Sequence, residues 1–188
     1  MSSKITIHSV AGYCYLSALW KMLVDLSRGL LENKFVEKKI LMPDAIIIDG
    51  DAFQIIDQDT SAPTVEFYPP EGIEIINEAS QVWSLGALVC YASSGHYIFG
   101  GRGGIYQHDH PTVGLPVLRK EHSELTALIQ RCLCYSPAQR ITLKDLYEQA
   151  CKGLEISEKR TRPEIKKKGN VSENSIFIAD DVWPEKMD

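Results

Sequence analysis

Apolar residues recur at helical spacing in four segments of the chain. The first predicts a long amphipathic helix over residues 13–31, because its apolar residues fall on one helical face: Leu16, Leu19, Trp20, Leu23, Leu26 and Leu30. Residues 80–92 are apolar on nearly every side, which places a second helix at the centre of a core. Similar one-sided patterns predict helices over 121–133 and from Thr142 to about Gly153.

Two short β-type runs, 45–48 and 53–56, flank a turn of Asp and Gly at 49–51. Asp and Gly tolerate the positive backbone angles of a tight turn, so the pattern predicts a β-hairpin. A two-stranded ribbon is marginal alone, and we expect it to lie against the helices. The fold class predicted is therefore mainly α with a small β-hairpin.

The charge pattern divides the chain into three parts. Residues 1–12 are expected to form an N-terminal extension or strand, and 13–153 a single domain. A charged, solvated tail is expected over 154–188, because 159–168 holds six basic residues and the chain ends in acidic ones. An apolar cluster inside the tail leaves two alternatives open, staying loose or docking on the body or a partner: Ile176, Phe177, Ile178, Val182 and Trp183.

Charge and segment length exclude several classes of function. A formal net charge of −5 argues against sequence-independent binding to nucleic acid, which needs a basic surface. The N-terminus lacks the apolar run and cleavage site of a secretory signal, and no apolar run reaches membrane-spanning length. We therefore expect a cytoplasmic protein that binds neither nucleic acid nor membrane.

Two kinds of short motif resemble ligand sites without the required context. The five cysteines, at 14, 90, 132, 134 and 151, are interpreted as core thiols rather than metal ligands, because their spacing fits no zinc site. The glycine cluster at 100–104 resembles a phosphate-binding loop. It is followed by no Lys-Ser or Lys-Thr pair, so a flexible surface loop is predicted there.

Several motifs match a known family in order along the chain. Residues Lys38 to Asp49 align with the kinase catalytic-loop pattern His-Arg-Asp-Leu-Lys-Pro-Glu-Asn and the strand after it, and retain Leu41 and Pro43. Further matches are the Pro-Glu that ends an activation segment at 70–71, the central-helix core at 82–86 and the closing-helix segments at 128–133 and 136–142. Over about residues 13–152 the chain resembles the C-terminal lobe of protein kinases, with the N-terminal lobe absent.

The resemblance implies a lobe without phosphoryl-transfer chemistry. Ile40 stands at the position of the catalytic Asp and cannot accept a proton, and Ala45 stands at the position of the metal-binding Asn. Gln81 replaces the Asp of the central helix that holds the catalytic loop. Asp57 is the one candidate metal ligand left, and a single carboxylate is too little for a tight magnesium site. No enzyme activity and no cofactor are therefore expected.

The resemblance also implies an ion pair inside the lobe, between Glu71 and Arg140. A buried carboxylate and guanidinium each need the other, because either one left alone is costly. The alternative is two separate surface charges.

Without an upper lobe, the face that would have met it is expected to be open and apolar, as interaction sites often are. The chain most resembles the kinase non-catalytic C-lobe type of domain, a protein-binding module. We therefore expect a scaffold or regulatory module that binds a protein, a peptide or a second copy of itself. The candidate partner-binding residues are Phe35, Ile40, Met42, Phe53, Phe67 and Tyr68. The alternative is half of a split kinase, completed by a separate N-terminal lobe and binding nucleotide and magnesium.

Overall fold

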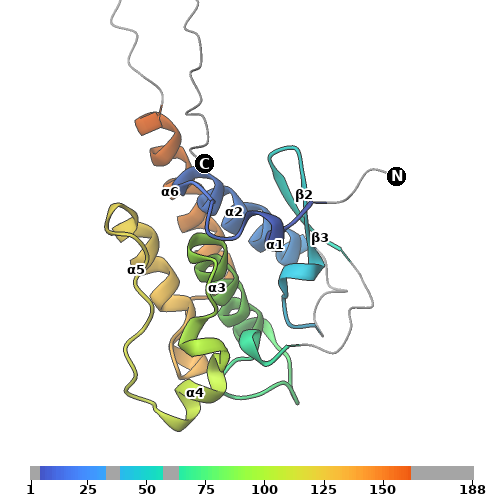
Figure 1. The fold of residues 1–188 in the computed structure, drawn as a ribbon, viewed down its shortest axis with the longest axis vertical. Helices are drawn as coiled ribbons and strands as arrows, with labels where there is room; N and C mark the ends of the chain where they lie inside the picture. The colour runs from blue at the N-terminus through green and yellow to red at the C-terminus, as the bar shows by residue number, and fades with distance from the viewer. Residues whose placement is uncertain (1–4, 33–38, 57–63, 162–188) are drawn as a thin grey trace, which may run out of the picture.

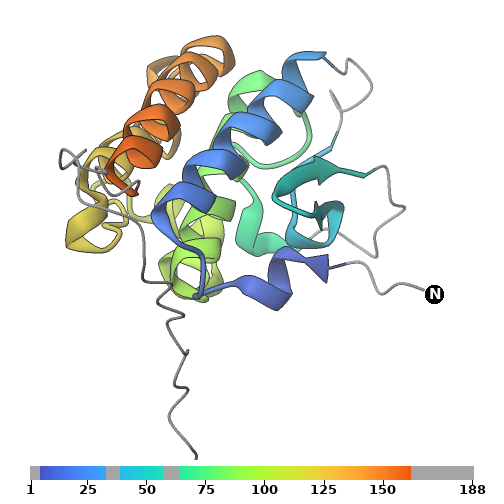
Figure 2. The ribbon, with the colours of Figure 1, turned by 90° about the horizontal axis from the view of Figure 1, so that it is seen from above.

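The computed structural model describes residues 5–32, 39–56 and 64–161, and these form a mainly α fold with a small antiparallel sheet. The six helices of the described residues are α1 (Ile7–Val10), α2 (Leu16–Glu32), α3 (Glu78–Ser94), α4 (Gly103–Asp109), α5 (Ser123–Cys132) and α6 (Leu143–Thr161). The strands are β1 (Ile5–Thr6), β2 (Ile46–Asp49) and β3 (Ala52–Ile55). Figures 1 and 2 place α5 and α6 on one side of α2 and α3, and the sheet on the other.

The central helix α3 is buried along nearly its whole length, as its uniformly apolar sequence predicts. Its first turn is capped by Asn77, whose side chain accepts a hydrogen bond from the backbone N–H of Ser80 at 3.1 Å. Gly95 ends the helix in the left-handed conformation, with a φ of +73°. The helix therefore has defined ends and serves as the axis on which the other elements pack.

Helices α2 and α6 pack along each other through a close approach at Gly153. A Cβ atom at Gly153 would lie 2.6 Å from the indole ring of Trp20. The prediction that the last helix ends near Gly153 is wrong, because α6 continues to Thr161. Its inward face extends past the glycine through Leu154, which packs on the core, and Ser157, which is buried.

The hairpin is confirmed, and the N-terminal segment adds a strand to it. β2 and β3 pair antiparallel, with Asp49 opposite Ala52 across the turn at Gly50. β1 then pairs antiparallel with β2, which makes the sheet three-stranded in the order β1-β2-β3. The backbone N–H of Phe53 donates to the Asp25 carboxylate of α2 at 3.1 Å, and this bond fixes the hairpin to the helices.

The prediction of a flexible surface loop at the glycine cluster is wrong for Gly103 and Gly104. Both are buried in the first turn of α4. A Cβ atom at Gly104 would lie 2.3 Å from backbone atoms of Pro69 and Pro70, and one at Gly103 would lie 2.3 Å from the carbonyl oxygen of Val65. Glycine is needed here because α4 packs directly on the backbone of residues 65–70.

None of the described helices combines the length with the apolar composition that crossing a bilayer requires.

Candidate functional site

The loop from Lys39 to Ala45, the predicted position of lost catalytic residues, is held by the central helix. Ser84 Oγ accepts a hydrogen bond from the backbone N–H of Leu41 at 3.3 Å. Gln81 Nε2 donates to the carbonyl oxygen of Lys39 at 3.4 Å. Both polar side chains are buried, so their bonds to the loop satisfy groups that would otherwise be costly. The loop is therefore held by two side chains that lie three residues apart, on one face of α3.

At the two positions that the resemblance assigns to proton transfer and metal binding, this loop carries side chains suited to neither. Ile40 is 7% exposed and apolar, and Ala45 ends a short 3-10 turn. Among the described ranges, no group of three or more His, Cys, Asp and Glu side chains is placed to hold a metal ion. Asp57, the candidate metal ligand, lies outside those ranges.

The prediction that the upper face is an open apolar surface is wrong for most of its residues. On that face Ile40, Met42 and Phe53 are buried. The two other candidate residues, Phe67 and Tyr68, belong to the segment 57–71, and they are buried and half-buried. Phe35 lies outside the described residues.

The N-terminal segment helps to close this face. Ile7 of α1 is fully buried in the same core cluster, and α1 contacts both the 3-10 turn at Pro43–Ala45 and α3. The N-terminal residues 5–10 therefore cover part of the surface that the sequence suggested was open.

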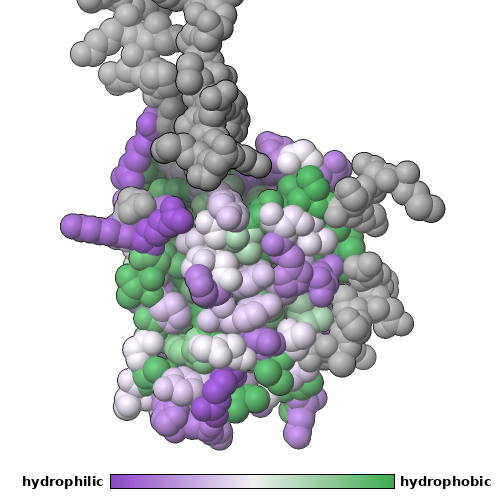
Figure 3. Space-filling model, viewed as in Figure 1, coloured by the Kyte–Doolittle hydropathy of each residue, from purple (hydrophilic) through white to green (hydrophobic). Residues whose placement is uncertain are grey.

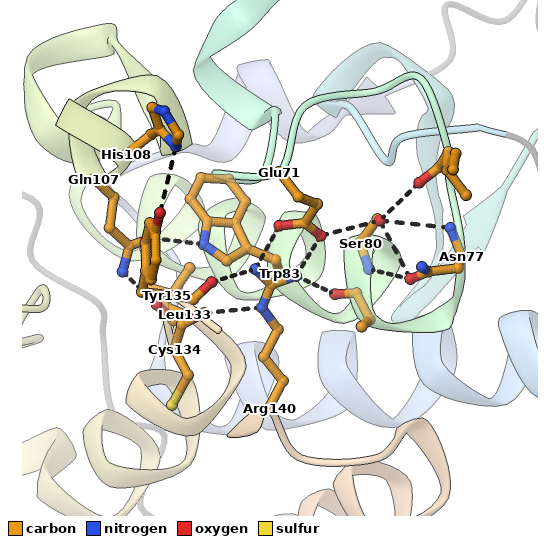
Figure 4. Close-up of polar contacts among 12 residues, drawn as sticks. Glu71, Asn77, Ser80, Trp83, Gln107, His108, Leu133, Cys134, Tyr135 and Arg140 are labelled. Carbon is orange, nitrogen blue, oxygen red and sulfur yellow. Dashed lines mark hydrogen bonds and ion pairs between the residues drawn. The ribbon is translucent and has the colours of Figure 1, made fainter. Parts of the chain in front are cut away.

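The Glu71–Arg140 ion pair is present beside the first turn of α3 (Figure 4). Arg140 Nη2 donates to Glu71 Oε2 at 2.6 Å, and Nη1 donates to Oε1 at 2.7 Å. The remaining guanidinium donors bond to three backbone carbonyls, of Ala79, Cys134 and Tyr135. Every guanidinium N–H is thus used, and the Arg140 side chain is 0% exposed.

Three further hydrogen bonds surround this ion pair (Figure 4). Ser80 Oγ donates to Glu71 Oε1 at 3.2 Å. The indole N–H of Trp83 donates to Gln107 Oε1 at 3.1 Å, and Gln107 Nε2 donates to the Leu133 carbonyl at 2.8 Å. The network joins the segment around Glu71, helices α3 and α4, and the chain between α5 and α6. Its polar groups are engaged with one another, so this is a structural arrangement rather than a reactive one.

His8 makes the arrangement closest to a catalytic relay among the described residues. Its Nε2 lies 3.2 Å from Asp44 Oδ1, and its Nδ1 lies 2.8 Å from the Tyr91 hydroxyl. Burial raises the pKa of Tyr91, which is the opposite of what an activated tyrosine needs. The bridge instead ties α1 to α3 and to the turn before β2.

The thiols are similarly unsuited to nucleophilic chemistry. All five cysteines are free, and Cys90 and Cys132 are buried. Burial raises the pKa of Cys90 to about 12, which keeps the thiol protonated at neutral pH. Cys90 lines a cavity of about 680 Å³ near the end of α3, yet it offers no reactive thiolate there. The prediction of core thiols is confirmed for Cys90 and Cys132.

An open groove of about 410 Å³ lies between α2, the hairpin and α6, and the sequence reasoning missed it. Tyr13 and Tyr15 line it and are 84% and 81% exposed. Its walls are mostly apolar and include Val10, Cys14, Ala18, Ile48, Phe53 and Leu154. The sequence pattern placed both tyrosines inside a helix over 13–31, whereas α2 begins at Leu16 and leaves them before its first turn.

The main chain before α2 fixes where these tyrosines stand. Gly12 adopts a φ of +85°, and its N–H donates to the Ala92 carbonyl of α3 at 2.9 Å. Such a backbone angle favours glycine, and the turn it makes leads the chain outward through Tyr13. On the face viewed in Figure 3, green apolar surface interrupts the hydrophilic surface in several places. The two tyrosines are the most exposed of the large apolar side chains among the described residues.

No protein-family model matches the chain, and a comparison with curated proteins also finds no match.

Proposed function

We propose that this protein is a non-catalytic module with the fold of a protein kinase C-terminal lobe, and that it acts by binding another protein or a peptide. The binding surface is the groove beside Tyr13 and Tyr15, with Phe53 in its wall. Of the residues suggested by the sequence for partner binding, Phe53 is the one that lines this groove.

The order of the elements supports the proposed fold. A long amphipathic helix, a hairpin, a helix buried on all sides and two closing helices follow one another along the chain. The fully bonded Arg140 guanidinium and the Glu71 carboxylate occupy the positions that the family resemblance implies for a structural pair. Fold alone does not give function, so the role must come from the surface.

The loop at 39–45 supports a role without chemistry. Its residues at the two reactive positions are Ile40 and Ala45, and neither offers a proton acceptor or a metal ligand. Gln81 still bonds to the loop, as a residue at that position would if the loop were kept for its shape. The loop then supports the core beneath the sheet.

The exposed tyrosine pair carries the proposal. Tyrosine presents a large apolar area with few rotatable bonds and is enriched in protein-binding surfaces. Two such side chains, each more than four-fifths exposed, stand beside an apolar groove. Their exposure contributes little to the stability of the isolated fold, which favours a role in binding.

Affinity capture with the tagged full chain tests this function. We expect the parent protein to enrich a partner, and the double variant Tyr13→Ser/Tyr15→Ser to lose it. Ile75→Ser is the matched control, because Ile75 is 76% exposed and does not line the groove. Equal recovery of the same partner by the parent and by the double variant contradicts the proposed site.

A further inference from the structure

We propose that the groove beside Tyr13 and Tyr15 is occupied by the chain's own C-terminal segment, whose apolar residues 176–183 dock there. The inference rests on the proposed function, since it names the ligand class of the same groove. The docked segment and an external partner then compete for one surface.

Helix α6 places the start of the C-terminal segment close to the groove. Leu154 and Glu158 of α6 line the groove, and the described helix ends at Thr161. Three residues of helix separate Glu158 from that end, which is about 4.5 Å at the rise of an α-helix. The chain that follows α6 therefore starts about one helical turn from the proposed site.

The length of chain beyond α6 is sufficient for an intramolecular contact. Fourteen residues, 162–175, precede the apolar cluster, and fully extended they span at most about 50 Å. A random-coil chain of that length has a root-mean-square end-to-end distance of about 20 Å, which exceeds the single helical turn between the end of α6 and the groove. Short linkers give effective concentrations of about 1 mM, so a weak intrinsic affinity is enough for docking.

The chemistry of the segment complements that of the groove. Its apolar residues, Ile176, Phe177, Ile178, Val182 and Trp183, match a groove with apolar walls. The charged groups lining the groove are Lys21, Asp51 and Glu158. Lys21 is paired with Asp25 at 2.6 Å, so the two acids dominate the rim. Lys166, Lys167 and Lys168, which precede the segment, carry the opposite charge, whereas Asp180 and Asp181 inside it carry the same charge as the rim. The match between segment and groove therefore rests on the apolar residues.

Fluorescence of Trp183 in the full chain tests the proposal. Trp20 and Trp83 are 4% and 0% exposed, and the signal of a Trp183→Phe variant gives their contribution for subtraction. An intrinsic affinity of about 0.3 mM against an effective concentration of about 1 mM leaves about three of four tails docked. We expect acrylamide to quench Trp183 about fourfold less in the parent than in Tyr13→Ser/Tyr15→Ser, with Ile75→Ser matching the parent.

Three outcomes overturn the inference. Unprotected Trp183 in the parent, quenched as fully as in the double variant, shows that the segment is not docked. Protection that grows with protein concentration shows docking on a second copy instead. Protection that persists in the double variant places the segment elsewhere on the body. Circular dichroism of each variant verifies that the fold is retained.

A second readout separates this inference from the proposed function. Ile176→Ser/Trp183→Ser alters the segment and leaves the groove intact, so we expect it to shift the NMR signals of Tyr13 and Tyr15 and to increase capture of a partner. Unchanged tyrosine signals overturn the docking of the segment, whatever the capture gives. Shifted signals with no partner captured by any variant support the docking and count against the proposed function.

Discussion

Arg140 and Tyr13 are large side chains in opposite environments. Arg140 is fully buried, and all of its donors are bonded. Tyr13 is 84% exposed beside an apolar groove. The first arrangement is costly to disturb because it leaves a buried charge without partners. The second contributes little to the fold, and its substitution should affect binding alone.

Removing Glu71 is the strongest test of the difference in stability cost between these two regions. Glu71→Ala leaves the buried Arg140 guanidinium without its counter-charge, and we expect a loss of about 3–5 kcal/mol in the free energy of unfolding. Asp109→Ala is the matched control, because Asp109 pairs with Arg102 where both side chains are about half exposed. Its expected cost is below about 1 kcal/mol. Urea unfolding of both variants measures the difference, and equal losses contradict the structural role of the network.

Thiol labelling compares the core with the groove. Burial raises the pKa of Cys90 from 9.0 to about 12, so its thiolate fraction at pH 8 falls by about a thousandfold. Burial also raises the pKa of Cys14, which lines the open groove. We expect Cys14 to react much faster than Cys90 with iodoacetamide in the native protein, as followed by mass spectrometry. Both rates should rise with pH, since the thiolate is the reacting form. Similar rates at the two sites in folded protein contradict the burial of Cys90.

The glycine in α6 tests the packing of α6 on α2. In an exposed helix Gly→Ala gains up to about 1 kcal/mol. At Gly153 the added methyl group meets the Trp20 ring at 2.6 Å, so Gly153→Ala is expected to cost about 1–3 kcal/mol instead. Thermal unfolding followed by circular dichroism shows directly whether Gly153→Ala stabilises or destabilises the protein. A stabilised variant is incompatible with the close approach of the two helices.

The smallest expected effect on stability is at the groove. Tyr13→Ser/Tyr15→Ser removes side chains that are mostly exposed, and we expect a change within about 0.5 kcal/mol in the free energy of unfolding. The same urea titration provides the measurement. A loss above about 2 kcal/mol in the free energy of unfolding means that the tyrosines stabilise the fold. That result contradicts the assignment of the groove as a binding surface.

Local patterns were enough to predict helices α2, α3, α5 and α6 and the hairpin, because periodicity and turn residues act over short stretches of chain. They did not predict α1 or α4. The Glu71–Arg140 pair could also be predicted, from motif positions. The burial of Ile40 and Met42 could not be predicted, because an apolar residue gives the same sequence pattern whether or not another segment covers it. The covering segment, with Ile7, is too short to carry a periodic pattern. The need for glycine at 104 likewise depends on the distant backbone of Pro69 and Pro70.

Phosphoryl transfer by the full chain tests the central claim most directly. The full chain is incubated with labelled ATP, magnesium and a general protein substrate, in parallel with an Asp57→Ala variant. We predict no incorporation of label by either protein, because Ile40 and Ala45 stand where a proton acceptor and a metal ligand are needed. Incorporation by the parent that Asp57→Ala abolishes contradicts the account and supports the split-kinase alternative.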